Sequence, residues 1–254
     1  MSNVTFAEGS RLTTIGDGAF IANPPLETIN LPDGLREIGR GVFSRGWECL
    51  GLSTISFPNS LEIVLENSFR GTPWFANQPD GKVYTGSVLY AFKGAFPADG
   101  RIEIARGTLG IAESALAGTW HYIPTGTINA VLIPSSVREI GEFGVGFRLG
   151  DFWPPVPIPG FTIYGVRGTA AERFANEHGF NFVEVEEFVL GDITGTGVVN
   201  IMDLQALLRH VSRRNLLIEE RQLLAADVNR DGVVDILDLR LLLQYVSRRI
   251  SSFD

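Results

Sequence analysis

The chain has 254 residues, of which 44% are hydrophobic and 20% are charged, a composition typical of a folded protein long enough for more than one domain. Its formal net charge is −8, and residues 190–254 hold eight of the 21 basic and nine of the 29 acidic residues, which leaves 13 basic and 20 acidic residues upstream. Nucleic-acid binding requires a basic stripe, so this acidic balance argues against a nucleic-acid partner.

The start of the chain shows no export or membrane signal. Met1-Ser-Asn-Val-Thr5 lacks the basic start and apolar core of a secretory signal, and no run of about 18 apolar residues predicts a membrane span. Cys49 is the only cysteine, so an internal disulfide is excluded. A lone cysteine is weak evidence for a nucleophile, and we interpret Cys49 as a half-buried structural residue.

Residues before about 188 repeat themselves. The segments 26–32 and 52–58 both read Leu-x-x-Ile-x-x-Pro at an offset of 26 residues, and residues 128–134 are a further copy. A second apolar pattern, usually ending in Phe, occurs at residues 12–20, 35–43, 61–69 and 137–145. Apolar positions at a fixed period indicate a solenoid, in which each turn sets a short strand, passes a proline-marked corner and returns through a second short segment. Because no turn can bury its apolar face alone, stability would come from stacking.

This pattern, Leu-x-x-Ile-x-x-Pro followed by Ile-Gly-x-x-Ala-Phe, resembles the BspA-like leucine-rich repeats of bacterial surface and secreted proteins over roughly residues 10–188. The resemblance implies that residues 1–188 form a mostly β, leucine-rich-repeat solenoid of short strands. Residues 102–116 are a copy that lacks the proline.

Three further segments depart from the repeat. Residues 72–94 break the period and predict a hairpin that turns at Gly86-Ser87. Residues 151–159 hold too many prolines for a helix or a central strand. Residues 169–179 have helix-forming composition, a threonine N-cap and a terminal glycine, so we expect a helix that closes the end of the domain.

No catalytic motif stands out in the sequence. His121, His178 and His210 have no metal-ligating neighbour at close helical or loop spacing, and no phosphate loop or nucleophile elbow occurs. We therefore expect no enzyme. Paired glycosidase carboxylates remain an alternative, because their pairing is spatial and is not visible in a sequence.

Aromatic residues outside the periodic core positions are candidate contacts for a protein or polysaccharide ligand. Packing of insertions and loops is the equal alternative for each of them. They are Trp47, Trp74, Trp120, His121, Tyr122 and Trp153.

Residues 227–238 match a calcium loop. Oxygen-bearing side chains occupy positions 1, 3, 5, 9 and 12, and Gly232 occupies position 6, where the backbone turns sharply. A hard divalent cation takes roughly six to eight oxygens, and a solvated polar turn is the alternative interpretation. The expected ligands are the side chains of Asp227, Asn229, Asp231, Asp235 (directly or through a water) and Asp238 and the backbone carbonyl of Val233.

A second copy of this loop lies 35 residues upstream, at residues 192–203, and nearly the same helix-forming segment follows both copies. No helical pattern precedes this first loop. Its expected ligands are Asp192, Thr194, Thr196, the Val198 carbonyl, Asn200 and Asp203. The threonines at positions 3 and 5 bring no charge, so the first loop has two carboxylates where the second has four. Because affinity rises with the number of charged ligands, we predict two Ca2+ sites, of which the first is weaker.

The duplicated unit of loop and outgoing helix, with Asp rather than Glu at position 12, resembles the dockerin module of cellulosome-type assemblies over roughly residues 189–250. The resemblance implies a small all-α, EF-hand-like domain at residues 189–254 that binds a cohesin domain of a scaffoldin and depends on calcium. In dockerins, positions 10 and 11 of each loop and the helix that follows contact the cohesin. Carried over to this chain, the contact residues are Ile201, Met202, Leu208, Arg209, Arg213, Ile236, Leu237, Leu243, Gln244 and Arg248.

Two points about these contact residues stay open. Each apolar one has packing inside the module's own small core as its alternative. The bulky apolar pairs at positions 10 and 11 also differ from the small hydroxylated pair of the best-known specificity class, so the class of cohesin is undetermined. The near-identity of the two helices predicts docking in two orientations related by an internal two-fold axis.

These expectations describe a secreted, non-catalytic component of a cellulosome-type complex in polysaccharide catabolism, whose repeat domain binds a protein or a polysaccharide. Such a role requires export, so we interpret residue 1 as a mature terminus or an artificial start from which a signal has been removed. The alternative is a polysaccharide-degrading or proteolytic enzyme of unrecognised type carried by a dockerin. The repeats consume nearly all of the remaining length, and this favours binding over catalysis.

Overall fold

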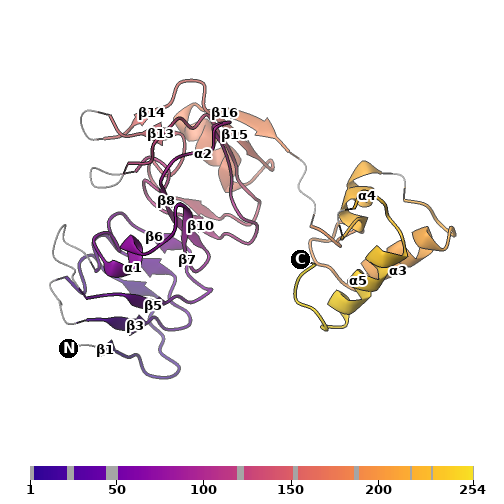
Figure 1. Cartoon of the computed structure of the whole chain (residues 1–254), viewed down its shortest axis with the longest axis horizontal. Helices are drawn as coiled ribbons and strands as arrows, with labels where there is room; N and C mark the ends of the chain where they lie inside the picture. The colour runs from indigo at the N-terminus through magenta and orange to yellow at the C-terminus, as the bar shows by residue number, and fades with distance from the viewer. Residues whose placement is uncertain are drawn as a thin grey trace. The chain divides into compact units, whose positions relative to one another are not determined.

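In a computed structural model of the chain, the described residues are 3–21, 26–43, 51–118, 123–150, 154–185, 189–217, 219–229 and 231–253. The chain forms two compact units, Met1–Val185 and Glu186–Asp254, each of which is described by itself (Figure 1). The division falls close to the domain boundary after residue 188 that the sequence predicts. The named elements of the first unit are mostly strands.

The Leu-x-x-Ile segments of the first unit form parallel strands. One sheet consists of β1 (Asn3–Val4), β3 (Thr28–Asn30) and β5 (Thr54–Ser56) in spatial order. Another consists of β9 (Arg101–Glu103), β11 (Ala130–Leu132), β15 (Thr162–Gly165) and β16 (Asn181–Glu184). Thr28 pairs with Thr54, which is the 26-residue offset of the repeat. Ile29 and Val131 are fully buried, so the repeated apolar position faces the core.

The second apolar pattern forms its own set of short parallel strands. One sheet consists of β2 (Thr14–Ile15), β4 (Glu37–Ile38) and β6 (Ile63–Val64). Another consists of β12 (Glu139–Ile140), β10 (Gly110–Ile111), β8 (Val88–Lys93) and β7 (Gly81–Thr85), of which β7 alone runs antiparallel to its neighbour. The two sequence patterns therefore correspond to two sets of parallel strands.

The closing phenylalanines of successive turns stack on one another. The ring centroids of Phe20 and Phe43 lie 5.2 Å apart, and those of Phe43 and Phe69 lie 5.3 Å apart. Phe43 and Phe69 are almost completely buried. Each ring thus covers the one before it, which is how a turn that cannot bury its own apolar face is stabilised by its neighbours.

The segments that interrupt the repeat fold as follows. β7 and β8 form the predicted hairpin, because Thr85 pairs with Val88 and leaves Gly86-Ser87 as the turn. The predicted closing helix is present as α2 (Ala170–His178), which ends at Gly179 with φ 70°. The proline-rich stretch contributes only a two-residue strand, β14 (Val156–Pro157), antiparallel to β13 (Phe147–Arg148). The short helix α1 (Pro73–Ala76), capped by the Thr72 hydroxyl, was not predicted.

The second unit is built on three helices, α3 (Ile201–Val211), α4 (Glu220–Ala226) and α5 (Ile236–Val246). α3 and α5 follow the two predicted calcium loops, whereas α4 precedes the second loop and was not predicted. Leu207 of α3 and Leu242 of α5, which are 35 residues apart, are both fully buried in a core with Ile193, Ala225 and Ala226. In the part of the chain that the structure describes, no helix is long and apolar enough to cross a membrane.

Candidate functional site

Two aspartates close the first loop from its two ends. Asp192, at position 1, accepts the backbone N–H of Gly197 at 2.8 Å. Asp203, at position 12, accepts the N–H of Thr194 at 2.8 Å with one oxygen and that of Asn200 at 2.8 Å with the other. Asp203 is fully buried and Asp192 nearly so. Since Asn200 in turn caps α3, the same bonds fix the loop and the start of the helix.

The threonines of the first loop bind its own ligands. Thr194 Oγ1 lies 2.6 Å from an Asp203 oxygen. Thr196 Oγ1 lies 3.2 Å from the Val198 carbonyl and 3.4 Å from an Asp192 oxygen. Both hydroxyls therefore point toward groups that the sequence assigns to a cation.

Two aspartates close the second loop in the same way. Asp227 accepts the backbone N–H groups of Asp231 and Gly232 at 3.1 and 2.9 Å, and Asp238 accepts those of Asn229 and Asp235 at 3.1 and 2.9 Å. Asp238 is fully buried, like Asp203. Gly232 has φ 85°, a backbone conformation open to glycine at no steric cost.

The other side chains of the second loop are carboxylates and an amide. Asp231 accepts the N–H of Val233 at 2.9 Å and the amide of Asn229 at 2.8 Å. Asp235 caps α5 by accepting the N–H of Leu237 at 2.7 Å. Four carboxylates, an amide oxygen and the Val233 carbonyl match the hard oxygen donors that calcium prefers, so the donor set of this loop fits that ion. Within the described ranges, no three His, Cys, Asp or Glu side chains gather closely enough to hold a metal ion.

Two apolar faces lie exposed where α3 and α5 begin. Ile201, Met202 and Leu208 of α3 are 52%, 57% and 52% exposed. Their counterparts 35 residues later, Ile236, Leu237 and Leu243, are 59%, 49% and 51% exposed. These six side chains therefore lie outside the core of the second unit, and the alternative of core packing is wrong for them. We call them the α3 face and the α5 face.

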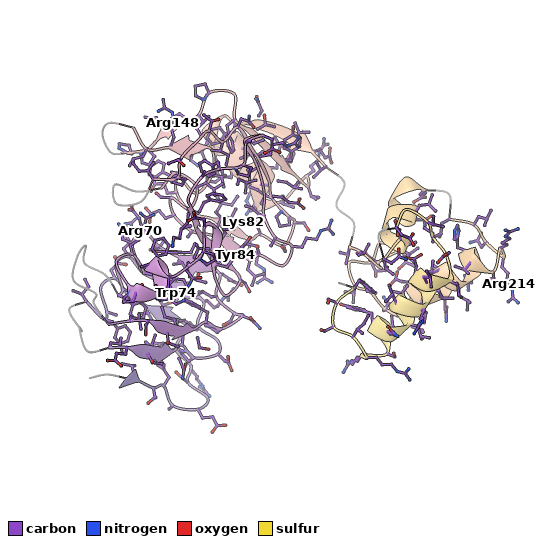
Figure 2. All side chains as sticks on the ribbon, in the orientation of Figure 1. Arg70, Trp74, Lys82, Tyr84, Arg148 and Arg214 are labelled. Atoms are coloured by element: carbon purple, nitrogen blue, oxygen red, sulfur yellow. The ribbon has the colours of Figure 1, made fainter. Side chains whose placement is uncertain are left out.

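Both helices end in the same strained turn. Arg213 and Arg248 each have φ 58°, a left-handed conformation that glycine usually adopts at this position. Arg214 donates its N–H to the Arg209 carbonyl at 2.9 Å, and Arg249 donates to the Gln244 carbonyl at 2.8 Å, which completes a Schellman motif in each copy. The predicted contact residues Arg209, Arg213 and Arg248 are exposed, and Gln244 is half-buried. Figure 2 marks Arg214 at the end of α3.

A groove joins the start of α3 to the end of α5. It has a volume of 760 Å³ and is lined by Asn200, Ile201, Tyr245, Arg248 and Arg249 among others. The two helices therefore run antiparallel, with the apolar start of one beside the basic end of the other. His210, the counterpart of Tyr245, accepts the backbone N–H of Leu217 at 3.0 Å through Nδ1 and serves the module's own structure.

The first unit brings two glutamates together. Glu113 accepts the Arg40 guanidinium at 3.0 and 3.1 Å and the backbone N–H of Glu66 at 3.2 Å. Burial, and then the negative charge of Glu113, raise the pKa of Glu66 above its usual range. Two carboxyls in such different surroundings are the arrangement that acid–base chemistry uses. Here, however, the contacts of Glu113 join neighbouring turns of the repeat, so they have a structural role.

Of the predicted aromatic ligand contacts of the first unit, Trp74 alone lies within the described residues. Trp47, Trp120, His121, Tyr122 and Trp153 lie outside the described residues, as does Cys49. Trp74 is half-buried, and its ring packs edge-on against Phe57 at 5.2 Å and Phe69 at 5.3 Å (Figure 2). His178 lies among Phe147, Phe174 and Phe180. Trp74 therefore has a packing role.

Two parts of the chain match known families. Residues 190–247 match the Dockerin type I domain, and residues 1–77 match the BspA type Leucine rich repeat region. No curated protein matches the chain. A matching solved structure is that of the third cohesin ScaC in complex with the ScaB dockerin from Acetivibrio cellulolyticus; the sequence identity is 32%, the match covers 26% of this chain and 93% of that one, and the TM-score is 0.26. The chain thus carries a dockerin type I domain after a BspA-type leucine-rich repeat region.

Proposed function

We propose that this chain is a non-catalytic, extracellular component of a cellulosome-type complex. Its all-α dockerin at residues 189–254 binds a cohesin domain of a scaffoldin, and its repeat domain, a solenoid over residues 1–188, holds a protein or polysaccharide ligand. The observation that carries the proposal is the pair of matched apolar faces, half exposed on the two helices of a dockerin domain. Exposed apolar patches on a small polar module mark a protein–protein contact.

The proposal includes calcium in both loops, bound more weakly by the first. When bound, the ion supplies positive charge that draws the loop's oxygens together. In the second loop it would be held by Asp227, Asn229, Asp231, Val233, Asp235 and Asp238. These residues also hold the start of α5 in place through the capping bonds of Asp235 and Asp238, which is how calcium would support the α5 face.

A capture assay tests the docking role. The full chain is passed over immobilised cohesins of several classes in calcium buffer, beside a variant in which Ile201, Met202, Ile236 and Leu237 are replaced by Ser. We expect capture of the native chain by one class and at least a hundredfold weaker capture of the variant, since the apolar centre of an interface supplies most of its affinity. Equal capture of both proteins would place the contact elsewhere.

A parallel screen separates binding from catalysis. The full chain is incubated with plant polysaccharides and with casein, and both retention and product release are measured. We expect retention on one substrate class without turnover. Turnover that is lost on replacing Glu66 or Glu113 by Gln would instead establish the enzyme alternative, because these are the paired carboxyls that the fold brings together.

A further inference from the structure

We infer that the first loop is closed by its own threonine hydroxyls and does not need calcium, so that the calcium-dependent stability of the dockerin comes from the second loop alone. The inference rests on the proposed calcium binding of the second loop. The two loops then differ in their need for calcium, although the helices and the exposed apolar faces that follow them are matched.

The hydroxyl of Thr194 is necessarily a donor. An ionised carboxylate can only accept hydrogen bonds, so the 2.6 Å contact between Thr194 Oγ1 and Asp203 is a charge-assisted bond in which the hydroxyl gives its proton to position 12 of the loop. With the backbone N–H groups of Thr194 and Asn200, Asp203 has three donors in a fully buried site.

The hydroxyl of Thr196 lies between two more expected ligands. Its oxygen is 3.2 Å from the Val198 carbonyl at position 7 and 3.4 Å from Asp192 at position 1. Positions 1, 7 and 12 are three of the places from which a calcium loop binds its ion. In the first loop position 12 therefore accepts the hydroxyl of Thr194, and positions 1 and 7 share the single hydroxyl proton of Thr196.

Among the described residues of the second loop, no side chain donates to the end carboxylates in this way. Its residues at positions 3 and 5 are Asn229 and Asp231, and the Asn229 amide donates to Asp231 rather than to the carboxylates at the two ends. Each of Asp227 and Asp238 accepts two backbone N–H groups and no side-chain donor among the described residues. The twelve residues of the second loop hold four carboxylates and one arginine, a net charge of −3, whereas the first loop holds two carboxylates, a net charge of −2. Like charges within one loop repel, so the second loop has the greater need of a cation.

The number of ions linked to folding is measurable. A ligand that binds only the folded state stabilises it in proportion to the logarithm of its concentration above Kd, so one linked ion gives about tenfold more protection from hydrogen exchange per tenfold rise in calcium, and two ions give about a hundredfold. We would measure exchange in peptides covering residues 201–211 and 236–246 of the full chain, with equilibrium dialysis to count bound calcium. We expect a tenfold slope and one tightly bound ion per chain, with an ion in the first loop bound only at much higher calcium concentration; a hundredfold slope or two ions of similar affinity would overturn the inference.

Reciprocal variants make the test specific to each loop. Thr194→Asn, Thr196→Asp and Asn200→Asp together give the first loop the four carboxylates of the second, and we expect a second ion and a hundredfold slope. Asn229→Thr, Asp231→Thr and Asp235→Asn together give the second loop the side chains of the first, and we expect the calcium dependence to disappear. A tenfold slope that survives this second exchange would show that the first loop binds calcium. If that variant does not fold, the first exchange and the native slope still decide.

Removing the hydroxyls tests their role directly. Thr194→Val with Thr196→Val keeps the shape of both side chains and deletes both hydroxyl donors. We expect faster exchange of residues 201–211 in calcium and in chelator alike, and no change would contradict the inference. A native chain that binds no calcium at all would refute the proposed function as well, whereas two ions of similar affinity in the native chain would refute the inference and the weaker first site but leave calcium-dependent docking intact.

Discussion

Five corner residues of the repeat unit share a left-handed backbone. Gly18, Gly41, Asn67, Ser114 and Phe143 occupy the equivalent place in successive turns and have φ between 56° and 65°. Side chains with a Cβ cost roughly 1–2 kcal/mol in this conformation, least for Asn. Every corner therefore requires a left-handed residue. Of these five turns, the first two have glycine there and the other three have a residue with a Cβ.

Ser114→Gly should stabilise the first unit. The Ser114 hydroxyl is fully buried, and among the described residues Ser114 Oγ has no hydrogen-bond partner. Glycine removes both this buried polar group and the left-handed strain, so we expect the free energy of unfolding to rise by about 1 kcal/mol in a denaturant titration. Gly41→Ser is the matched control and should lower it; a destabilising Ser114→Gly would show that the corner is not strained.

The contributions of Glu66 and Glu62 to the stability of the first unit should change with pH in opposite directions. Burial and Glu113 raise the pKa of Glu66, so its contribution to stability is complete below the unfolded value of about 4.5 and is lost as pH rises through the folded value. The Arg36 hydrogen bond, with that of Arg138, lowers the pKa of Glu62, so its contribution is present above the unfolded value and is lost as pH falls.

Melting curves of the two glutamine variants between pH 3 and 8 test this pair. Glu66→Gln should raise the melting temperature of the first unit at pH 7 and change it little at low pH. Glu62→Gln should lower the melting temperature at pH 7 and change it little at low pH, because the ion pairs with Arg36 and Arg138 are lost only where Glu62 is charged. The same sign of change at pH 7 in both variants would contradict the two assignments.

At the scale of the elements, the hairpin interrupts the backbone bonding between turns. Phe20 and Phe43 donate their N–H groups to carbonyls of the following turn, at Val42 and Ser68. Phe69 donates instead to the Tyr90 phenolic oxygen at 3.0 Å, because the straight strand β8 stands where the next corner would be. A buried tyrosine thus replaces a missing carbonyl.

Tyr90→Phe should therefore be costly. It leaves the buried N–H of Phe69 without its acceptor, and we expect a loss of about 1–3 kcal/mol in the free energy of unfolding of the first unit. Tyr84→Phe is the control, since Tyr84 accepts the N–H of Ala105 at 3.1 Å at an exposed site where water can take its place (Figure 2). Equal losses of unfolding free energy in the two variants would show that the buried hydrogen bond from Phe69 to Tyr90 stabilises the unit no more than the exposed one at Tyr84.

The two helix faces of the dockerin should substitute for each other. Replacing Ile201, Met202 and Arg209 by Ala should cost less than about 1 kcal/mol of cohesin affinity, and so should replacing Ile236, Leu237 and Gln244, because the untouched face can dock in the other orientation. Replacing both sets should abolish binding in a calorimetric titration. A large loss from one set alone would refute docking in two orientations.

Local signals in the sequence predicted much of this molecule. The 26-residue offset, the turn at Gly86-Ser87, the helix after Thr169 and the helices after both loops all follow from short-range patterns. α4 has a helix-forming sequence and could have been found by the same reasoning, whereas four-residue α1 depends on its packing against the repeat. The roles of Tyr90 and Glu113 could not be predicted, since both depend on partners in other turns.

At the scale of the whole molecule, the candidate site also combines features that follow from local sequence patterns with features that depend on contacts made only in the folded chain. Spacing alone predicts a ligand set for both loops, and the sequence contains the difference in their charge. It did not show that the Thr194 hydroxyl binds Asp203, nor that Ile201 and Ile236 are equally exposed, because both facts depend on how the loops close. We propose that one repeat domain is delivered to a scaffold by one dockerin.

Calorimetric titration of the full chain with a panel of cohesins, first in calcium and then in excess chelator, tests this account most directly. We predict tight one-to-one binding to one class of cohesin that weakens by at least a hundredfold when calcium is removed, because the stability of the whole dockerin, and with it of both faces, depends on the ion in the second loop. Binding to that cohesin with equal affinity in chelator, or to none of the panel in calcium, would contradict calcium-dependent docking as the function of this chain.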